Sequence, residues 1–130
     1  MPTFRLNKLV RDKIPELNRE RGIVVTARTL DEDEYKTELI KKFKEELSEL
    51  ANAGDANEFA KELADIQTIL DSLCIVAKVS KDELHDLQQR ISNKAGSFND
   101  RQYIETLLIP EGDEWVAYYR KDPKRFPEII

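Results

Sequence analysis

The chain has 130 residues, enough for one domain with a hydrophobic core. Hydrophobic residues make up 40% of it, which argues against disorder, and the net charge of −5 does not favour a nucleic acid polymer as its partner. The single cysteine excludes a disulfide framework. Because the sequence contains neither an apolar run of membrane-spanning length nor an apolar leader segment, we expect a cytoplasmic protein without membrane contact.

The first predicted elements are a short helix and a strand. Residues 8–22 are expected to form the helix, because Pro15 is tolerated near a first helical turn and Gly22 suits the position that ends a helix. Residues 23–28 are rich in β-branched side chains, which predicts a short strand.

Three longer helices are predicted next, each opened by a capping box. In a capping box, an Asp or Ser side chain and a Glu three residues later satisfy backbone N–H groups that lack a partner within the helix. The helices are expected at about 31–53, 55–78 and 80–93, and their boxes pair Asp31 with Glu34, Asp55 with Glu58, and Ser80 with Glu83.

The last part of the chain is expected to hold a second strand and a tail. Residues 103–109 are a candidate strand that would pair antiparallel with 23–28. After residue 109 aromatic side chains stand among charges and prolines, which indicates a tail that packs on the body or on a partner. We therefore predict a mainly all-α antiparallel helical bundle with one short two-stranded β pair, a domain of residues 1–109 and a C-terminal tail of 110–130.

Four carboxylates on the first two long helices carry the chemical information. Glu46 and Glu49 are spaced i, i+3, and so are Glu62 and Asp65, so each pair projects from one face of its helix. At about 100° per residue, Glu46 and Glu62 fall within the apolar stripes of their helices. Buried carboxylates are costly unless they are paired or bound to a metal. Their positions therefore favour a functional site over a solvated surface.

The two carboxylate pairs are expected to face each other across a short turn between antiparallel helices. Four converging carboxylates repel one another unless a cation neutralises them. Oxygen ligands of this kind suit magnesium, with manganese as the alternative, and magnesium sites are commonly completed by the phosphates of a substrate. The sequence therefore predicts metal-dependent phosphate chemistry.

The order Glu-Glu-x-x-Glu and then Glu-x-x-Asp resembles the signature of the MazG-like, all-α NTP pyrophosphatase superfamily. Within it, residues 8–15 and the Gly-Ser-Phe-Asn-Asp-Arg stretch at 96–101 resemble the small, phosphoribosyl-ATP pyrophosphohydrolase-like branch of predicted house-cleaning enzymes. The resemblance covers about residues 6–108. It implies that the four carboxylates bind magnesium.

The reaction implied by the resemblance is hydrolysis of a nucleoside triphosphate between its α and β phosphates, giving a monophosphate and pyrophosphate. Magnesium would neutralise phosphate oxygens and lower the pKa of the attacking water. Glu46 or Glu49 is expected to accept the proton of that water. The candidates for phosphate contacts are basic residues of the motif-bearing segments: Arg11, Lys13, Lys94 and Arg101.

Two alternatives stay open, a dedicated phosphoribosyl-ATP pyrophosphohydrolase and a non-enzymatic helical dimerisation module with solvated carboxylates. The helix at 57–78 is apolar around most of its circumference, more than two other helices can cover. We therefore expect a homodimer or a dimer of dimers, with Ile69, Leu73 and Val76 near the shared core.

Overall fold

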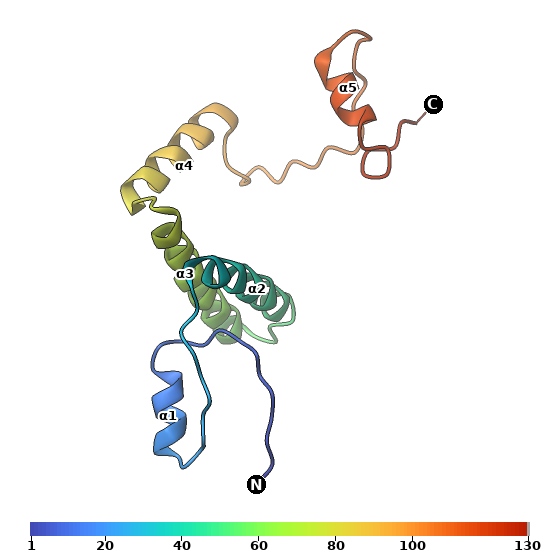
Figure 1. Ribbon diagram of the computed structural model, residues 1–130. Coiled ribbons are helices and arrows are strands. Elements are labelled where there is room, and N and C mark those ends of the chain that lie inside the picture. The colour runs from blue at the N-terminus through green and yellow to red at the C-terminus, as the bar shows by residue number, and fades with distance from the viewer. Residues whose placement is uncertain (130) are drawn as a thin grey trace. The chain divides into compact units, whose positions relative to one another are not determined.

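The computed structural model describes residues 1–129, and more than half of this part of the chain is helical. The helices found there are α1 (Ile14–Glu20), α2 (Glu32–Ala51), α3 (Ala56–Ala77), α4 (Lys81–Ala95) and α5 (Glu114–Arg120) (Figure 1). The predicted mainly all-α fold is confirmed. Among the helices of residues 1–129, none is both long enough and apolar enough to cross a membrane.

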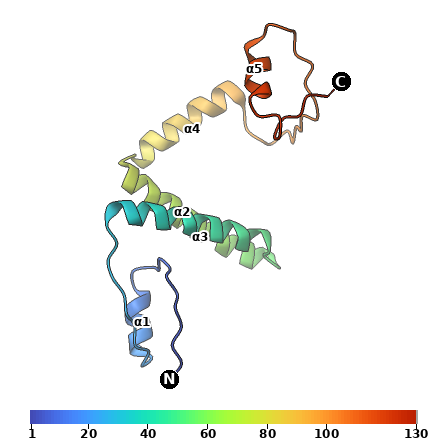
Figure 2. The same ribbon diagram turned by 45° about the vertical axis from the view of Figure 1, so that its right-hand side comes forward.

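Helices α2 and α3 form an antiparallel pair joined by a tight turn. They lie side by side in Figure 1 and Figure 2, and they are the helices that pack together most extensively. Their contact buries Leu39 of α2 with Ile66 and Ile69 of α3. The predicted bundle is therefore supported for this pair, which also carries the four carboxylates.

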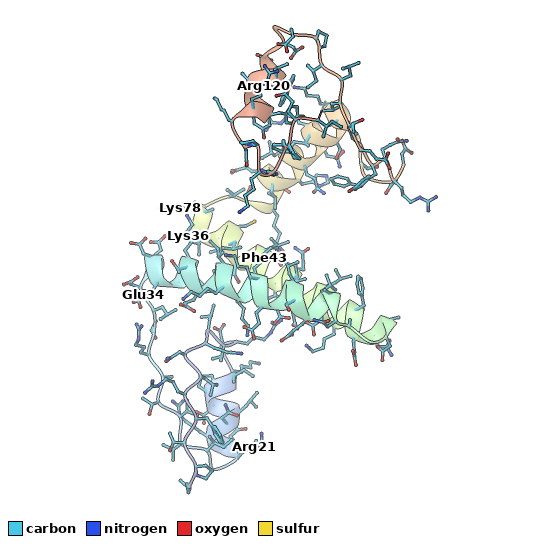
Figure 3. The ribbon with its side chains drawn as sticks, turned by 90° about the vertical axis from the view of Figure 1, so that its right-hand side faces the viewer. Arg21, Glu34, Lys36, Phe43, Lys78 and Arg120 are labelled. Atoms are coloured by element: carbon cyan, nitrogen blue, oxygen red, sulfur yellow. The ribbon has the colours of Figure 1, made fainter. Side chains whose placement is uncertain are left out.

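The caps predicted for the three long helices are present. In each, the cap side chain accepts a hydrogen bond from the backbone N–H three residues later: Asp31 from Glu34 (2.8 Å), Asp55 from Glu58 (2.8 Å) and Ser80 from Glu83 (3.1 Å). In a complete capping box, the Glu side chain also accepts a hydrogen bond from the N–H of the cap residue, and here two of the Glu side chains bond elsewhere. The Glu58 carboxylate accepts from the N–H of Gly54, and the Glu34 carboxylate, labelled at the start of α2 in Figure 3, binds Arg28 at 2.7 Å.

The first helix is shorter than the predicted helix at 8–22, because α1 has seven residues. Pro15 lacks an N–H and its ring would clash with a preceding helical turn, so it is confined to the first turn and the helix cannot extend toward residue 8. Gly22 ends the helix as predicted. It adopts a φ of +79° and donates its N–H to the carbonyl of Arg19 at 2.9 Å.

The predicted β pair of residues 23–28 and 103–109 is wrong, since residues 1–129 contain no strand. Residues 23–28 instead form an irregular connection to α2, in which Val24 is 80% exposed. β-branched residues favour a strand only where a pleated neighbour exists to pack against. An isolated two-stranded pair is marginal in water, and the two segments belong to different compact units.

The chain divides into two compact units, Met1–Asn93 and Lys94–Ile130. The first contains α1, α2, α3 and nearly all of α4. The predicted domain of residues 1–109 with a tail of 110–130 stays a prediction, because a compact unit need not coincide with a functional domain.

The second unit contains a helix that the sequence analysis did not predict. Asp113 caps α5 by accepting a hydrogen bond from the N–H of Trp115 at 2.9 Å. Aromatic side chains gather around this helix, with the rings of Tyr119 and Phe126 5.0 Å apart. Arg120 binds Glu128 at 2.7 Å, which ties the helix to the chain that follows it.

Candidate metal centre

The turn between α2 and α3 brings three acidic side chains together. One oxygen each from Glu46, Glu49 and Glu62 lies within 4.8 Å of the others. Glu46 and Glu62 are buried, with 7% and 9% of their surface exposed, while Glu49 is exposed. Three of the four predicted metal ligands are therefore close enough to bind one cation together.

One oxygen of each buried carboxylate lacks a hydrogen-bond partner. The Oε2 atoms of Glu46 and Glu62 are both buried without a hydrogen-bond partner. A buried acceptor left unpaired carries the full cost of its lost hydration, and the cost is larger for a charged group. A divalent cation would give both oxygens a partner, so these residues fit a hard metal ion such as magnesium.

The environment drives the pKa values of the two buried carboxyl groups apart. Burial raises the pKa of Glu46 to about 7, assisted by hydrogen bonding with Glu62 and by repulsion from Glu49, Glu62 and Asp65. The pKa of Glu62 is lowered, first by its hydrogen bond with Glu46 and then by Lys61. Glu46 therefore keeps its proton up to about neutral pH in the metal-free chain, whereas Glu62 stays ionised more readily.

Asp65, the fourth predicted ligand, is held by basic side chains beside this group. Its Oδ1 accepts a hydrogen bond from Arg11 at 2.7 Å, and its Oδ2 accepts one from Lys61 at 2.9 Å. The hydrogen bonds from Lys61 and from Arg11 lower the pKa of Asp65. Because both of its oxygens are engaged, the role of Asp65 as a metal ligand stays a prediction.

Arg11 is a predicted phosphate contact that bonds directly to one of the four carboxylates, Asp65. It lines an open groove of about 400 Å³ together with Glu46 and Asp65. Lys13 is the N-cap residue of α1 and does not line this groove. Lys94 and Arg101 belong to the second compact unit, so their contacts with phosphates stay predictions.

Three lysines near the carboxylates were not among the predicted site residues. Lys61 precedes Asp65 by four residues, and this helical spacing was a readable signal for an ion pair. Lys42 lines the groove and lies 3.9 Å from Glu45. Lys8 binds Glu45 at 2.9 Å across 37 residues of sequence, and no local pattern announces such a contact.

Comparison with known proteins does not identify a function for the chain. Neither a protein-family model nor a solved structure matches the chain. A stretch of 55 residues, 42% of this chain, is 47% identical to an uncharacterized protein of Mycolicibacterium smegmatis. The match covers 55% of that protein, so the chain spans about half the length of the relative.

Proposed function

We propose that this chain is a magnesium-dependent nucleoside triphosphate pyrophosphohydrolase of the MazG-like, all-α kind, acting on noncanonical nucleotides. The observation that carries the proposal is the pair of buried, unpartnered oxygens of Glu46 and Glu62, with Glu49 close beside them. Their arrangement on two antiparallel helices is the one that the Glu-Glu-x-x-Glu and Glu-x-x-Asp motifs imply.

Glu46, Glu49 and Glu62 would hold the metal. When bound, magnesium supplies charge neutralisation for the phosphate oxygens and a water of lowered pKa. Glu49 is the better candidate for accepting the proton of that water, because it is open to solvent whereas Glu46 is buried. Arg11 lines the groove beside Glu46, and its guanidinium is suited to a bidentate contact with a phosphate.

The alternative of a non-enzymatic dimerisation module has one observation in its favour, a set of exposed apolar side chains on the two long helices. That set is equally compatible with an enzyme that dimerises. The module leaves the two unpartnered, buried carboxylate oxygens without a reason, because a structural helix pair would be more stable with apolar residues there. A pyrophosphohydrolase that dimerises would account for both features.

The products test the reaction directly. We expect the full chain with MgCl₂ to convert at least one triphosphate of a panel into monophosphate and pyrophosphate in equal amounts, and to do nothing in EDTA. The panel contains standard and noncanonical nucleotides and phosphoribosyl-ATP, with products resolved by ion-exchange chromatography. Diphosphate and orthophosphate as the products would refute cleavage between the α and β phosphates, and turnover of phosphoribosyl-ATP alone would favour the dedicated enzyme.

We further propose that the chain works as a homodimer or a dimer of dimers. The buried apolar residues of residues 1–129 are few, whereas other apolar residues of the helix pair remain more than a third exposed. Burying a large aliphatic or aromatic side chain fully contributes roughly 1.5–3 kcal/mol, so covering this surface would be strongly favourable. The exposed residues are Ile40 and Leu47 on α2 and Phe59, Leu63, Leu70 and Ile75 on α3.

Leu70→Asp tests the dimer, because Leu70 is 38% exposed on α3 and an aspartate there would bury an unpaired charge in the interface. We expect a dimer or tetramer for the native chain and a monomer for Leu70→Asp, measured by light scattering at micromolar concentration. Val24→Asp, at an exposed site outside the helices, is the matched control and should assemble as the native chain does. Leu73 is a poorer choice since it is half-buried within its own chain. A native chain that is monomeric, or a Leu70→Asp variant that still assembles, contradicts the proposal.

A further inference from the structure

The ammonium group of Lys61 binds two of the four carboxylates at once. Its Nζ lies 2.9 Å from Oδ2 of Asp65 and 3.4 Å from Oε1 of Glu62. A lysine side chain is protonated near neutral pH, so a positive charge lies between these two carboxylates. One positive charge therefore links Glu62, a member of the close group, to Asp65, the predicted ligand outside it.

The two oxygens of Asp65 have different partners, and this difference decides what a metal ion would meet. Arg11 occupies Oδ1, whereas Lys61 occupies Oδ2. Among residues 1–129, Arg11 bonds to no other carboxylate, while Lys61 lies between Asp65 and Glu62. If Lys61 left, Oδ2 would be free for a cation that also contacts Glu62, and Arg11 could remain on Oδ1.

We propose that Lys61 is the resident counter-ion of the metal centre. It neutralises Glu62 and Asp65 in the metal-free chain and is displaced when a divalent cation binds, which releases Asp65 as the fourth ligand. This inference rests on the proposed metal site, and it adds how that site is kept stable when empty and what sets its affinity.

Displacement of Lys61 is physically inexpensive. Its side chain is 67% exposed, so the ammonium group can move into water with little loss, and exposed ion pairs of this kind contribute little. A divalent cation carries twice the charge and suits the same oxygens. Lys61 therefore lowers the apparent affinity for the metal, because each binding event must first break its two contacts.

Lys61→Gln tests this role, since glutamine is a polar residue of similar helix propensity that lacks the charge. The matched control is Lys41→Gln. Lys41 lies on α2 and is also 67% exposed. It binds Glu38 of α2 at 3.0 Å, and Glu38 is outside the carboxylate group. The full-length variants are titrated with MnCl₂ at fixed salt and pH 7.5, and free Mn²⁺ is followed by electron paramagnetic resonance.

We expect the half-saturating Mn²⁺ concentration to fall roughly 3- to 30-fold in Lys61→Gln, the range that follows from removing two exposed ion pairs and one repelling charge. Lys41→Gln should leave it unchanged. The gain in Mn²⁺ affinity should also vanish when Asp65→Asn is added, because the carboxylate oxygen that Lys61 would release is then missing. A gain that persists in the double variant would mean that Lys61 acts by distant repulsion, and it would overturn displacement.

The outcomes separate this inference from the proposed function. Equal or weaker Mn²⁺ binding by Lys61→Gln, beside normal binding by the native chain, overturns the counter-ion role and leaves the enzyme proposal standing. Tighter binding by Lys61→Gln without pyrophosphate release from any triphosphate supports the counter-ion role and overturns the enzyme. Failure of every variant to bind Mn²⁺ overturns the metal centre and the counter-ion role together.

Discussion

Glu49→Gln is expected to reduce magnesium-dependent pyrophosphate release roughly 10³-fold or more, because metal assistance of this kind is worth several kcal/mol in the transition state. Glu49 contributes an oxygen to the close carboxylate group, and an amide in its place carries no charge to hold a cation. The side chain is exposed, so the substitution should leave α2 and α3 folded. Initial rates under saturating MgCl₂ give the loss, and far-ultraviolet circular dichroism confirms the helices. Asp65→Asn should show a comparable loss if Asp65 joins the site.

Glu38→Gln is the control for this experiment, as it makes the same change on the same helix. Glu38 pairs with Lys41 at 3.0 Å and lies outside the carboxylate group. Its activity should match that of the native chain. Activity of Glu49→Gln within a few fold of native would show that Glu49 does not serve the metal, and would reduce the centre to Glu46 and Glu62.

The parts of the fold that could be predicted from the sequence are those determined by neighbouring residues. A cap such as Asp31 or Asp55 acts on an N–H three residues away, so its signal is complete within one helical turn. The β pair failed because a strand depends on a partner that sequence alone does not reveal. Helix α5 was missed because the prolines and charges around it outweighed the single local signal of Asp113.

In the candidate site, too, the features set by neighbouring residues could be predicted, and a contact between distant residues could not. The i, i+3 spacing and the short turn determine where Glu46, Glu49 and Glu62 lie, and both are local features. The contact of Arg11 with Asp65 joins residues 54 positions apart, so the pairing could not be predicted even though both residues were named. It arises from the path of the first segment over the helix pair, which tertiary packing decides.

The unpartnered oxygens have an energetic consequence for the metal-free protein. Glu46 keeps its proton more tightly in the folded chain than in the unfolded chain, where its pKa is near 4.5. Stability from this group is therefore fully present below about pH 4.5 and is lost as the pH rises through about 7. Above that pH the folded chain carries an unneutralised, buried charge, at a cost of up to about 3 kcal/mol.

Glu46→Gln should consequently stabilise the metal-free protein, and more at pH 8 than at pH 5. The amide removes the charge that burial and the neighbouring carboxylates disfavour, while it keeps the shape of the side chain. In EDTA at pH 8 we expect Glu46→Gln to melt roughly 5–10 °C above the native chain. At pH 5 the native Glu46 is largely protonated, so most of the difference should disappear. Thermal unfolding followed by circular dichroism at the two pH values measures both effects.

The same melting experiment can be repeated with magnesium in place of EDTA. At pH 8 it should raise the melting temperature of the native chain by binding the folded state, and it should raise that of Glu46→Gln much less because one ligand is lost. Glu38→Gln should follow the native chain at both pH values and with magnesium. A Glu46→Gln variant that melts below the native chain in EDTA at pH 8 would identify Glu46 as a structural partner in the helix pair, and the metal centre would then lose its central carboxylate.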